Sequence, residues 1–559
     1  MRHLVALLLL AAAASAQDDL RTHYDVVTYR LDLEVIPDTK TLDGWSAVEA
    51  KVLSDGLNKL HLDAAAALEV NKVILLDGAL DGTRKLKGKE LKFTRDGDAL
   101  MIALGKTIAK DDFVRVAVRY RSKPSGNRGR GRRGRGGGTR GVVWSKSEGG
   151  SPWVGTTCQG PGAHSWWPCK SNWYHANDKF ATLYVNATVP RGLYAVSNGA
   201  LQKREKKGRR ETFRWRHPYP CETYAVTLNV GKYDVVKQEL TLPGLEKKVP
   251  FIYYVLPENR KKADLQFKQV PELLKIYSER FGPWPFPDAK FALVEAPLWG
   301  MEHSTAVAYG SSYPAWCKKT GARDRYGSRN RWFDYILVHE VAHEWWGNAV
   351  SAEHWGHFWI HEGFGTYAEG VYVEFTQGRE AADRYFGSGR SGRGRLYRGD
   401  HPTSGQAYSG TIYSKGSRVL NTLRHYVNDD DAWWKSLRDF NTKHRYGNAT
   451  TEDFQEVLEA NTNRKWGQFF KEWFYGSGTP QVLGTVKVTG DVAHIDVEVK
   501  GDFHVPLDLA WTVKGKKATS RVWLDPGQNT TEVPCNGRPK QLEVVHLGRV
   551  LGRHDVKVN

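Results

Sequence analysis

Cysteine is scarce in this 559-residue chain, and its spacing follows no recognisable pattern. The five cysteines are Cys158, Cys169, Cys221, Cys317 and Cys535. They are too scattered for a small protein held together by disulfides, and none has the spacing of a zinc thiolate site. The odd number leaves at least one cysteine unpaired within the chain, and Cys158 with Cys169 is the bond we expect first.

Long hydrophobic runs are absent beyond the N-terminus, so the sequence predicts no membrane-spanning helix there. The first residues, "MRHLVALLLLAAAASAQDD", have a basic start, a short apolar stretch and small residues at Ala14 and Ala16. This pattern is typical of a secretory signal peptide. We expect residues 1–16 to be removed after Ala16, which places the protein in the periplasm or outside the cell. A retained membrane anchor is the alternative.

Acidic residues are outnumbered, with 62 Asp and Glu against 81 Lys and Arg, and the net charge is +19. Much of the excess lies in two arginine- and glycine-rich runs, residues 126–141 and 387–399. No aromatic platform for bases is interleaved with these arginines, so we expect flexible insertions and no nucleic-acid partner. A nucleic-acid-binding arm is the alternative.

The periodicity of apolar residues changes twice along the chain, and no solenoid-type repeat is present. Alternation at period two, typical of strands, extends from about Thr28 to Val236. Helical spacing, as in residues 261–282, dominates to about Tyr475, after which alternation returns. The sequence therefore predicts a multidomain α+β protein. Its parts are a β-rich domain at 17–240, a mostly helical domain at 241–478 and a small β-domain at 479–559.

The stretch "VHEVAHEWWG" places two histidines four residues apart. On a helix His339 and His343 point from one face and can share a metal ion, with Glu340 beside it. Glu362 follows His343 after 18 intervening residues, enough for a return to a second helix. Three protein ligands leave a fourth position for water, as in catalytic zinc sites. We therefore expect one Zn²⁺ ion.

Two other interpretations of this stretch remain open at the level of residues. The histidines could face a hydrophobic core, or hold a structural zinc ion, although Glu340 would then have no purpose beside the site. His357 and His361 are also four residues apart, but no third ligand accompanies them as a second metal site.

Together, His339, Glu340, His343 and Glu362 resemble the gluzincin metallopeptidases. "WGMEHSTAVAY" (residues 299–309) is similar to the Gly-x-Met-Glu-Asn segment of the aminopeptidase N family, which includes leukotriene hydrolase.

Within that segment Gly300, Met301 and Glu302 match, while His303 replaces the asparagine. His361 likewise replaces the asparagine that commonly precedes the third ligand.

Two further segments extend the resemblance over nearly all the expected mature chain. "TIYSKGSRVL" is similar to the family's Tyr-x-Lys-Gly stretch, which places its tyrosine at Tyr413. "TTCQGPGAHSWWPC" is similar to the segment that sends a Gln or Glu into the site, here Gln159. The resemblance implies a thermolysin-like catalytic domain and a C-terminal β-sandwich, in a short form without the large helical C-terminal domain of many members.

The resemblance also implies a role for each matching residue. Glu340 is the general base, and Tyr413 stabilises the oxyanion. Glu302 and Gln159 bind the free α-ammonium of the substrate, beside Gly300 and Met301. Glu369 orients a zinc ligand.

The expected function is thus a zinc aminopeptidase acting on peptides with a free N-terminus. The alternatives are a zinc endopeptidase, an epoxide hydrolase of the leukotriene hydrolase kind, and a catalytically inactive peptide-binding protein.

Overall fold

The computed structural model describes residues 19–122, 141–158, 162–171, 179–310, 312–321, 333–387, 392–400 and 402–559. The predicted signal peptide, residues 126–140 of the arginine-rich insertion, and Gln159 lie outside the described residues. Within the described chain, no helix combines the length and apolar character needed to cross a membrane.

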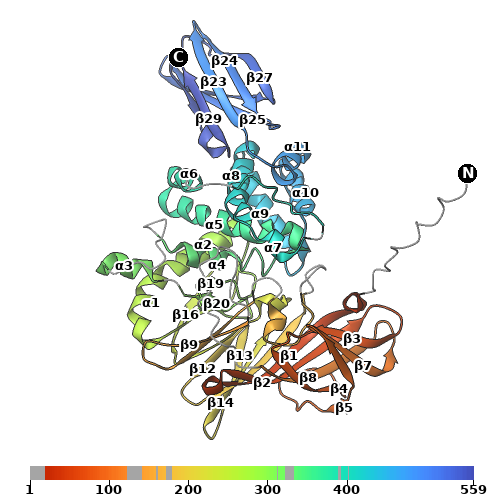
Figure 1. Ribbon diagram of the computed structural model, residues 1–559. Coiled ribbons are helices and arrows are strands. Elements are labelled where there is room, and N and C mark those ends of the chain that lie inside the picture. The colour runs from red at the N-terminus through yellow and green to blue at the C-terminus, as the bar shows by residue number, and fades with distance from the viewer. Residues whose placement is uncertain are drawn as a thin grey trace, which may run out of the picture.

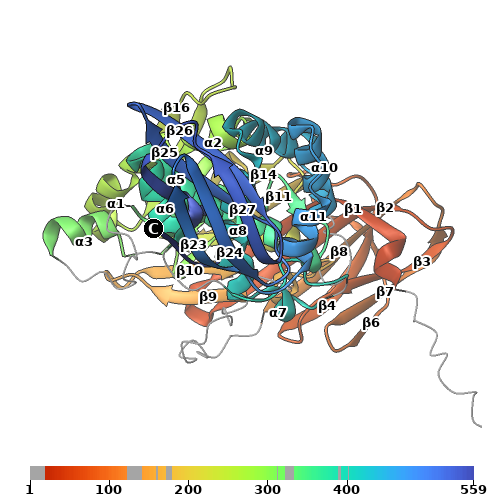
Figure 2. The same cartoon turned by 90° about the horizontal axis from the view of Figure 1, so that it is seen from above.

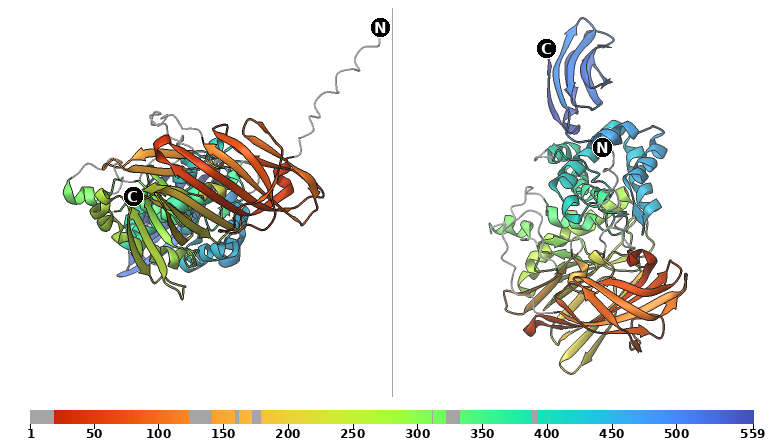
Figure 3. Two further views of the ribbon diagram at one scale, coloured as in Figure 1. Left: turned by 90° about the horizontal axis from the view of Figure 1, so that it is seen from below. Right: turned by 45° about the vertical axis from the view of Figure 1, so that its right-hand side comes forward.

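Three parts follow one another along the long axis of the molecule (Figure 1). β-sheets of the N-terminal part lie at one end, helices fill the middle, and the C-terminal sheets stand at the other end (Figure 3, right). The predicted β, mostly α, then β order is confirmed, and with it the multidomain α+β class.

The N-terminal part is built on an eight-stranded sheet in which β1 and β11 are parallel and the other neighbouring pairs antiparallel. In spatial order its strands are β13 (Ala200–Lys207), β14 (Arg210–His217), β11 (Thr182–Pro190), β1 (Tyr24–Ile36), β2 (Thr41–Val52), β8 (Phe113–Ser122), β4 (Leu68–Leu76) and β5 (Gly88–Glu90). The alternating apolar residues found in the sequence, such as Leu31 and Leu33, face one buried core.

Two smaller sheets complete this part of the molecule. One contains β3 (Leu57–Asp63), β7 (Ala99–Ile108) and β6 (Phe93–Asp96). The other contains β12 (Tyr194–Ser197), β15 (Leu228–Gly231), β10 (Pro152–Thr157) and β9 (Gly141–Lys146).

A five-stranded mixed sheet separates the N-terminal core from the helices. Its order is β16 (Asp234–Leu240), β17 (Val249–Val255), β18 (Phe291–Glu295), β20 (Val307–Tyr309) and β19 (Gly300–Met301). Alternate side chains enter different cores: Val294 packs with the N-terminal sheets, whereas Leu293 packs with the helices. This sheet therefore fixes residues 300–302 between the two large parts of the molecule.

Four of these strands, β17 to β20, fall inside the region where the sequence predicts mainly helices. The strand β18 reads "FALVE" and is buried on both faces, so it lacks the alternation that reveals a half-exposed strand. β19 and β20 are two and three residues long, too short for any periodicity.

Most of the helices form the middle of the molecule. They are α1 (Arg260–Gln266), α2 (Val270–Phe281), α3 (Pro314–Thr320), α4 (Tyr335–Ala342), α5 (Trp359–Gln377), α6 (Arg379–Gly387), α7 (Ser404–Ala407), α8 (Gly416–Val427), α9 (Asp430–His444), α10 (Thr451–Thr462) and α11 (Gly467–Phe470). The π-helical turn Thr411–Lys415 leads into α8, and the π-helical turn Lys471–Tyr475 follows α11. The short strands β21 (Ser351–Ala352) and β22 (Asn448–Ala449) pair with each other.

The single helix expected over residues 261–282 is divided in two. α1 ends at Gln266, a 3-10 turn covers Phe267–Gln269, and α2 starts at Val270. Pro271 explains the break, because its ring clashes with the carbonyl four residues earlier and it has no N–H to donate.

The C-terminal part is a β-sandwich of two sheets over a common core (Figure 2). One sheet contains β27 (Gly527–Pro534), β24 (Val492–Lys500), β23 (Gln481–Thr489) and β29 (Arg553–Val558); the other contains β26 (Lys516–Leu524), β25 (Val505–Val513) and β28 (Lys540–Val545). It docks on the helices through Trp473 against Phe503, with ring centroids 4.7 Å apart. In addition, Tyr426 Oη donates to the carbonyl of His504 over 2.7 Å.

The expected Cys158–Cys169 disulfide is wrong, since both cysteines are buried free thiols. The Cys158 Sγ accepts a hydrogen bond from the Trp166 indole at 3.0 Å. The backbone of Cys169 is instead bridged to Asp63 of β3.

We expect the contact between α5 and α6 to be sensitive to a single methyl group. A Cβ at Gly370 would lie 2.0 Å from Phe386 Cζ. The Gly370→Ala variant should therefore lose about 1–3 kcal/mol of stability by overpacking, although alanine favours helices. Gly405→Ala in α7, where the nearest atom is 4.0 Å away, is the control. A lowered thermal midpoint for Gly370→Ala alone is predicted; equal midpoints would contradict this packing.

Candidate metal centre and active site

The helix α4 carries the first part of the site and is fixed at its start. Asp334 caps it by accepting from the Leu337 amide at 3.4 Å, and Tyr309 Oη donates to the same carboxylate at 2.5 Å. The apolar side chains of Leu337 and Val341 are fully buried. The helix ends at Ala342, and His343 occupies the cap position.

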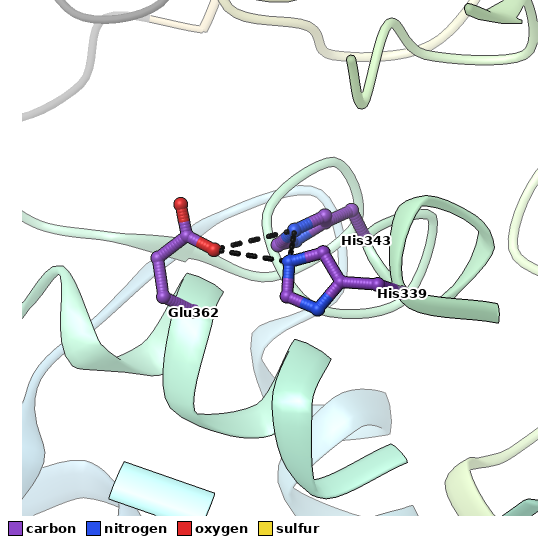
Figure 4. Close-up of side chains that lie close together, drawn as sticks. All are labelled: His339, His343 and Glu362. Atoms are coloured by element: carbon purple, nitrogen blue, oxygen red, sulfur yellow. Dashed lines mark hydrogen bonds and ion pairs between the residues drawn. The ribbon is translucent and has the colours of Figure 1, made fainter. Parts of the chain in front are cut away.

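His339, His343 and Glu362 converge on one point (Figure 4). The two Nε2 atoms are 3.2 Å apart, and Glu362 Oε2 lies 3.3 Å from His339 Nε2 and 3.5 Å from His343 Nε2. Glu362 comes from α5, whose Gly365 makes room: a Cβ there would lie 3.0 Å from His343 Cε1. All three side chains are almost entirely removed from solvent.

The hydrogen bonds at the far side of each ring set the tautomers. His343 donates from Nδ1 to the carbonyl of Trp346 at 2.8 Å. His339 donates from Nδ1 to Glu369 Oε1, also at 2.8 Å. Each neutral ring therefore has its lone pair at Nε2, directed at Glu362. Tyr385 Oη donates to the other oxygen of Glu369 and holds that carboxylate.

These distances fit a tetrahedral metal ion. Bonds of about 2.0–2.1 Å to nitrogen or oxygen place neighbouring ligand atoms about 3.3–3.4 Å apart in a tetrahedron. The three observed separations of 3.2, 3.3 and 3.5 Å bracket that value. Two imidazoles and a carboxylate are also a ligand set of catalytic zinc sites.

Glu340 projects toward Gly300 of β19. A Cβ on Gly300 would lie 2.6 Å from Glu340 Oε1 and 2.9 Å from Ile336 Cγ2. Any side chain at residue 300 would therefore displace this carboxylate. Burial raises the pKa of Glu340 to about 8 in the metal-free protein, where His339 partly opposes the rise and Glu302 adds to it.

Tyr413 reaches the same point from the π-helical turn before α8. Its Oη donates to Glu362 Oε1 at 2.6 Å, and its ring stacks on His339 at a centroid distance of 6.0 Å. The turn lies close to α5 because two glycines meet: a Cβ on Gly416 would be 2.8 Å from the Cα of Gly363. Burial, followed by the charge of Glu362, raises the pKa of Tyr413 well above its usual value.

Glu302 lies close enough to His343 and Glu362 to interact with their charges, and one of its carboxylate oxygens is unpaired in the described chain. The residue is 4% exposed, and its buried Oε1 has no hydrogen-bond partner among the described residues. Its backbone carbonyl accepts from Asn348 Nδ2 at 2.9 Å, and the Asn348 amide donates to His343 O at 2.9 Å. Met301 packs into the N-terminal core and anchors the segment.

The two histidines that replace family asparagines differ in their surroundings. His361 has both ring nitrogens in use: Nε2 accepts from the Ala352 amide at 2.9 Å and Nδ1 contacts Tyr224 Oη at 3.1 Å. His303 is fully buried, and neither ring nitrogen has a partner in the described chain. Burial lowers the pKa of His303 to about 3, so the ring is neutral.

Because both ring nitrogens of His361 already have partners, His357 and His361 cannot together form a second metal site. A different group, Glu353, His354 and His357, has ligand atoms within 4.8 Å of one another. However, His354 Nδ1 accepts from the Gly356 amide and His357 Nδ1 accepts from the Thr451 amide, each at 3.0 Å. Each neutral ring therefore carries its proton on Nε2, which then has no lone pair for a metal.

Sequence reasoning missed several residues that support the site. Asn348, Tyr385 and the Trp346 carbonyl each hold a site residue in place, as described above. Asn348 and Trp346 have one sequence signal, which is their proximity to the His339–His343 pair. Tyr385 has no such signal. Gln159 is outside the described residues, so its position stays a prediction.

Residues 265–473 match the family described as Peptidase family M1 domain. Over 320 residues the chain is 24% identical to Aminopeptidase M1 of Arabidopsis thaliana, covering 55% of this chain and 35% of that protein. It is 23% identical to Probable aminopeptidase 2 of Sulfurisphaera tokodaii over 363 residues, 61% of this chain and 44% of that protein. Residues 265–473 of the chain are therefore a peptidase family M1 domain.

The chain spans less than half the length of either of those two relatives. Its fold resembles the crystal structure of an M1 zinc metallopeptidase from Deinococcus radiodurans, with a TM-score of 0.63 at 20% identity. That likeness covers 82% of this chain and 95% of the other. All residues of the candidate metal centre lie within the M1 match.

If Glu369 orients His339, its loss should weaken metal binding without removing a ligand. We expect Glu369→Gln to lower zinc affinity by about 10–100-fold, measured by competition with a chelator. Glu380→Gln changes an exposed carboxylate on the next helix and is the control. Unchanged affinity in Glu369→Gln would show that the contact does not tune the site.

Proposed function

We propose that this protein is a zinc-dependent aminopeptidase that hydrolyses the first peptide bond of peptides with a free N-terminus. The observation that carries the proposal is the buried, unpaired carboxylate oxygen of Glu302, next to three convergent metal-ligand side chains. An unpaired charge in such a place is costly unless a cation joins it, and a substrate α-ammonium is such a cation.

His339, His343 and Glu362 are the residues that would hold one Zn²⁺ ion. Zinc held there would supply a Lewis acid at the scissile carbonyl. The names of two relatives, Aminopeptidase M1 and Probable aminopeptidase 2, support this reaction, and the name of the similar M1 zinc metallopeptidase from Deinococcus radiodurans supports this metal.

Glu340 is the proposed general base. It takes a proton from the attacking water and passes it to the leaving amine. Its position opposite Gly300, next in sequence to the proposed ligand His339, suits a carboxylate that must accept a proton and then release it.

Tyr413 is the proposed donor to the developing oxyanion. Its hydroxyl is already within hydrogen-bond distance of Glu362, and burial keeps it protonated. A donor positioned at that point contributes mainly in the transition state.

Glu302 would determine which bond is cut. With the α-ammonium paired to Glu302, only the first carbonyl can reach the metal ligands and Glu340. An endopeptidase has no use for a buried anion at this place. Gly300 leaves space for the substrate backbone, and we propose Gln159 as a second acceptor for the ammonium.

Matched peptides test the proposal. The same peptide with a free and with an acetylated N-terminus should differ strongly in cleavage rate, and a zinc chelator should abolish cleavage of the free form. Equal cleavage of both peptides would instead establish an endopeptidase, and cleavage of neither by zinc-loaded protein would establish an inactive one.

The Glu340→Gln variant tests the proposed base. We expect it to retain zinc and its thermal midpoint while kcat falls by about 10²–10⁴-fold, because the amide cannot accept the water proton. Glu353→Gln, an exposed carboxylate beyond the helix, should keep full activity. Turnover near wild type in Glu340→Gln would remove Glu340 from this role.

The Glu302→Gln variant tests the anchor for the ammonium. Loss of one partner of a buried charge pair costs about 2–5 kcal/mol, so kcat/KM for free-amine peptides should fall by at least about 30-fold. Zinc content should not change, and the difference between free and acetylated peptides should shrink. A large loss of zinc instead would make Glu302 part of the metal site rather than the substrate site.

A further inference from the structure

Trp299 is a large aromatic residue that remains exposed directly beside the proposed active site. Its exposed fraction is 45%, although it immediately precedes the buried β19 segment. The backbone is fixed, because the Trp299 carbonyl accepts from the Gly310 amide at 2.9 Å. The ring packs edge-on against Tyr335, the first residue of α4, with centroids 6.1 Å apart.

The β19 segment runs along α4 in the opposite direction. Asn348 ties the backbone of Glu302 to the His343 end of the helix, as described above. Gly300 faces Glu340 in the middle of the helix, and Trp299 contacts Tyr335 at its start. The order Glu302, Gly300, Trp299 therefore follows α4 from its end to its beginning.

The backbone of Gly300 is oriented away from the sheet. Gly300 lies opposite Tyr309 in this antiparallel pair of strands. The hydrogen bond between the strands instead joins their neighbours, from the Gly310 amide to the Trp299 carbonyl, so Gly300 and Tyr309 do not bond to each other. Its own N–H and C=O groups therefore point away from β20. β19 is the end strand of this sheet in the described chain, so these groups face the side where a peptide backbone could lie.

This arrangement gives a direction to the bound peptide, provided that the proposed function holds. In such a peptide the ammonium pairs with Glu302, and the first carbonyl lies beside Gly300 and Glu340. These are the first two positions in the order Glu302, Gly300, Trp299 along α4. The residue after the scissile bond then extends toward Trp299 and Tyr335.

We propose that Trp299 selects the residue that follows the scissile bond and favours aromatic and large aliphatic side chains there. An indole that is partly exposed and held by Tyr335 offers an apolar face to such a side chain. Trp299 immediately precedes Gly300, Met301 and Glu302, which are the residues of this segment that match the family.

Dipeptide amides that share an N-terminal leucine test this inference. The series is Leu-Gly-amide, Leu-Lys-amide, Leu-Leu-amide and Leu-Phe-amide, with leucinamide as the substrate that has no residue after the scissile bond. The variants are Trp299→Gly and Trp299→Phe, each checked for zinc content and thermal midpoint.

We expect the wild type to cleave Leu-Phe-amide about tenfold faster than Leu-Gly-amide, measured as kcat/KM. In Trp299→Gly this ratio should fall to about one while leucinamide cleavage stays within about twofold of wild type. Trp299→Phe should keep most of the preference.

Three results would overturn the inference. The first is a wild type that cleaves the whole series equally, and the second is an unchanged ratio in Trp299→Gly. The third is an equal loss on leucinamide and Leu-Phe-amide, which would make Trp299 a general structural residue. All three leave the proposed function intact. Failure of zinc-loaded wild type to cleave leucinamide or any dipeptide amide would instead refute the proposed function, and the inference with it.

Discussion

The crossing of α4 and α5 is the contact on which the rest of the site depends. It brings two imidazole nitrogens and a carboxylate oxygen to within 3.2–3.5 Å of one another in a buried setting. Three lone pairs directed at one point repel one another unless a cation is shared between them. Glycine at residue 365 permits the approach, and the outer hydrogen bonds of both rings fix their orientation.

In the proposed function, the five-stranded sheet would add a fixed position for the end of the substrate, which a metal centre alone cannot supply. Its strands separate two hydrophobic cores, so the segment around Glu302 is held from both sides. Gly300 lies so close to Glu340 that any side chain at residue 300 would displace the Glu340 carboxylate. If the proposed function holds, cleavage chemistry and choice of bond come from different layers of the molecule, joined along one face of α4.

The chemistry of the site was more predictable than the architecture around it. The spacing of His339, His343 and Glu362 identified the residues that converge, because helical periodicity converts spacing into direction. The same periodicity argument failed for β18, which is buried on both faces, and for residues 261–282, where Pro271 divides the helix. Cysteine spacing gave a wrong disulfide, since pairing depends on approach in space. Nor could any local pattern reveal that Glu302 and His303 are buried with unpaired polar atoms.

The central claim is that one zinc ion is held by His339, His343 and Glu362. Anomalous diffraction at the zinc absorption edge, from crystals of the purified protein, tests it most directly. The account predicts one strong peak, about 2.0–2.2 Å from both Nε2 atoms and from the Glu362 carboxylate. Zinc-supplemented crystals with no peak there, or with a peak only beside Glu353, His354 and His357, would contradict it.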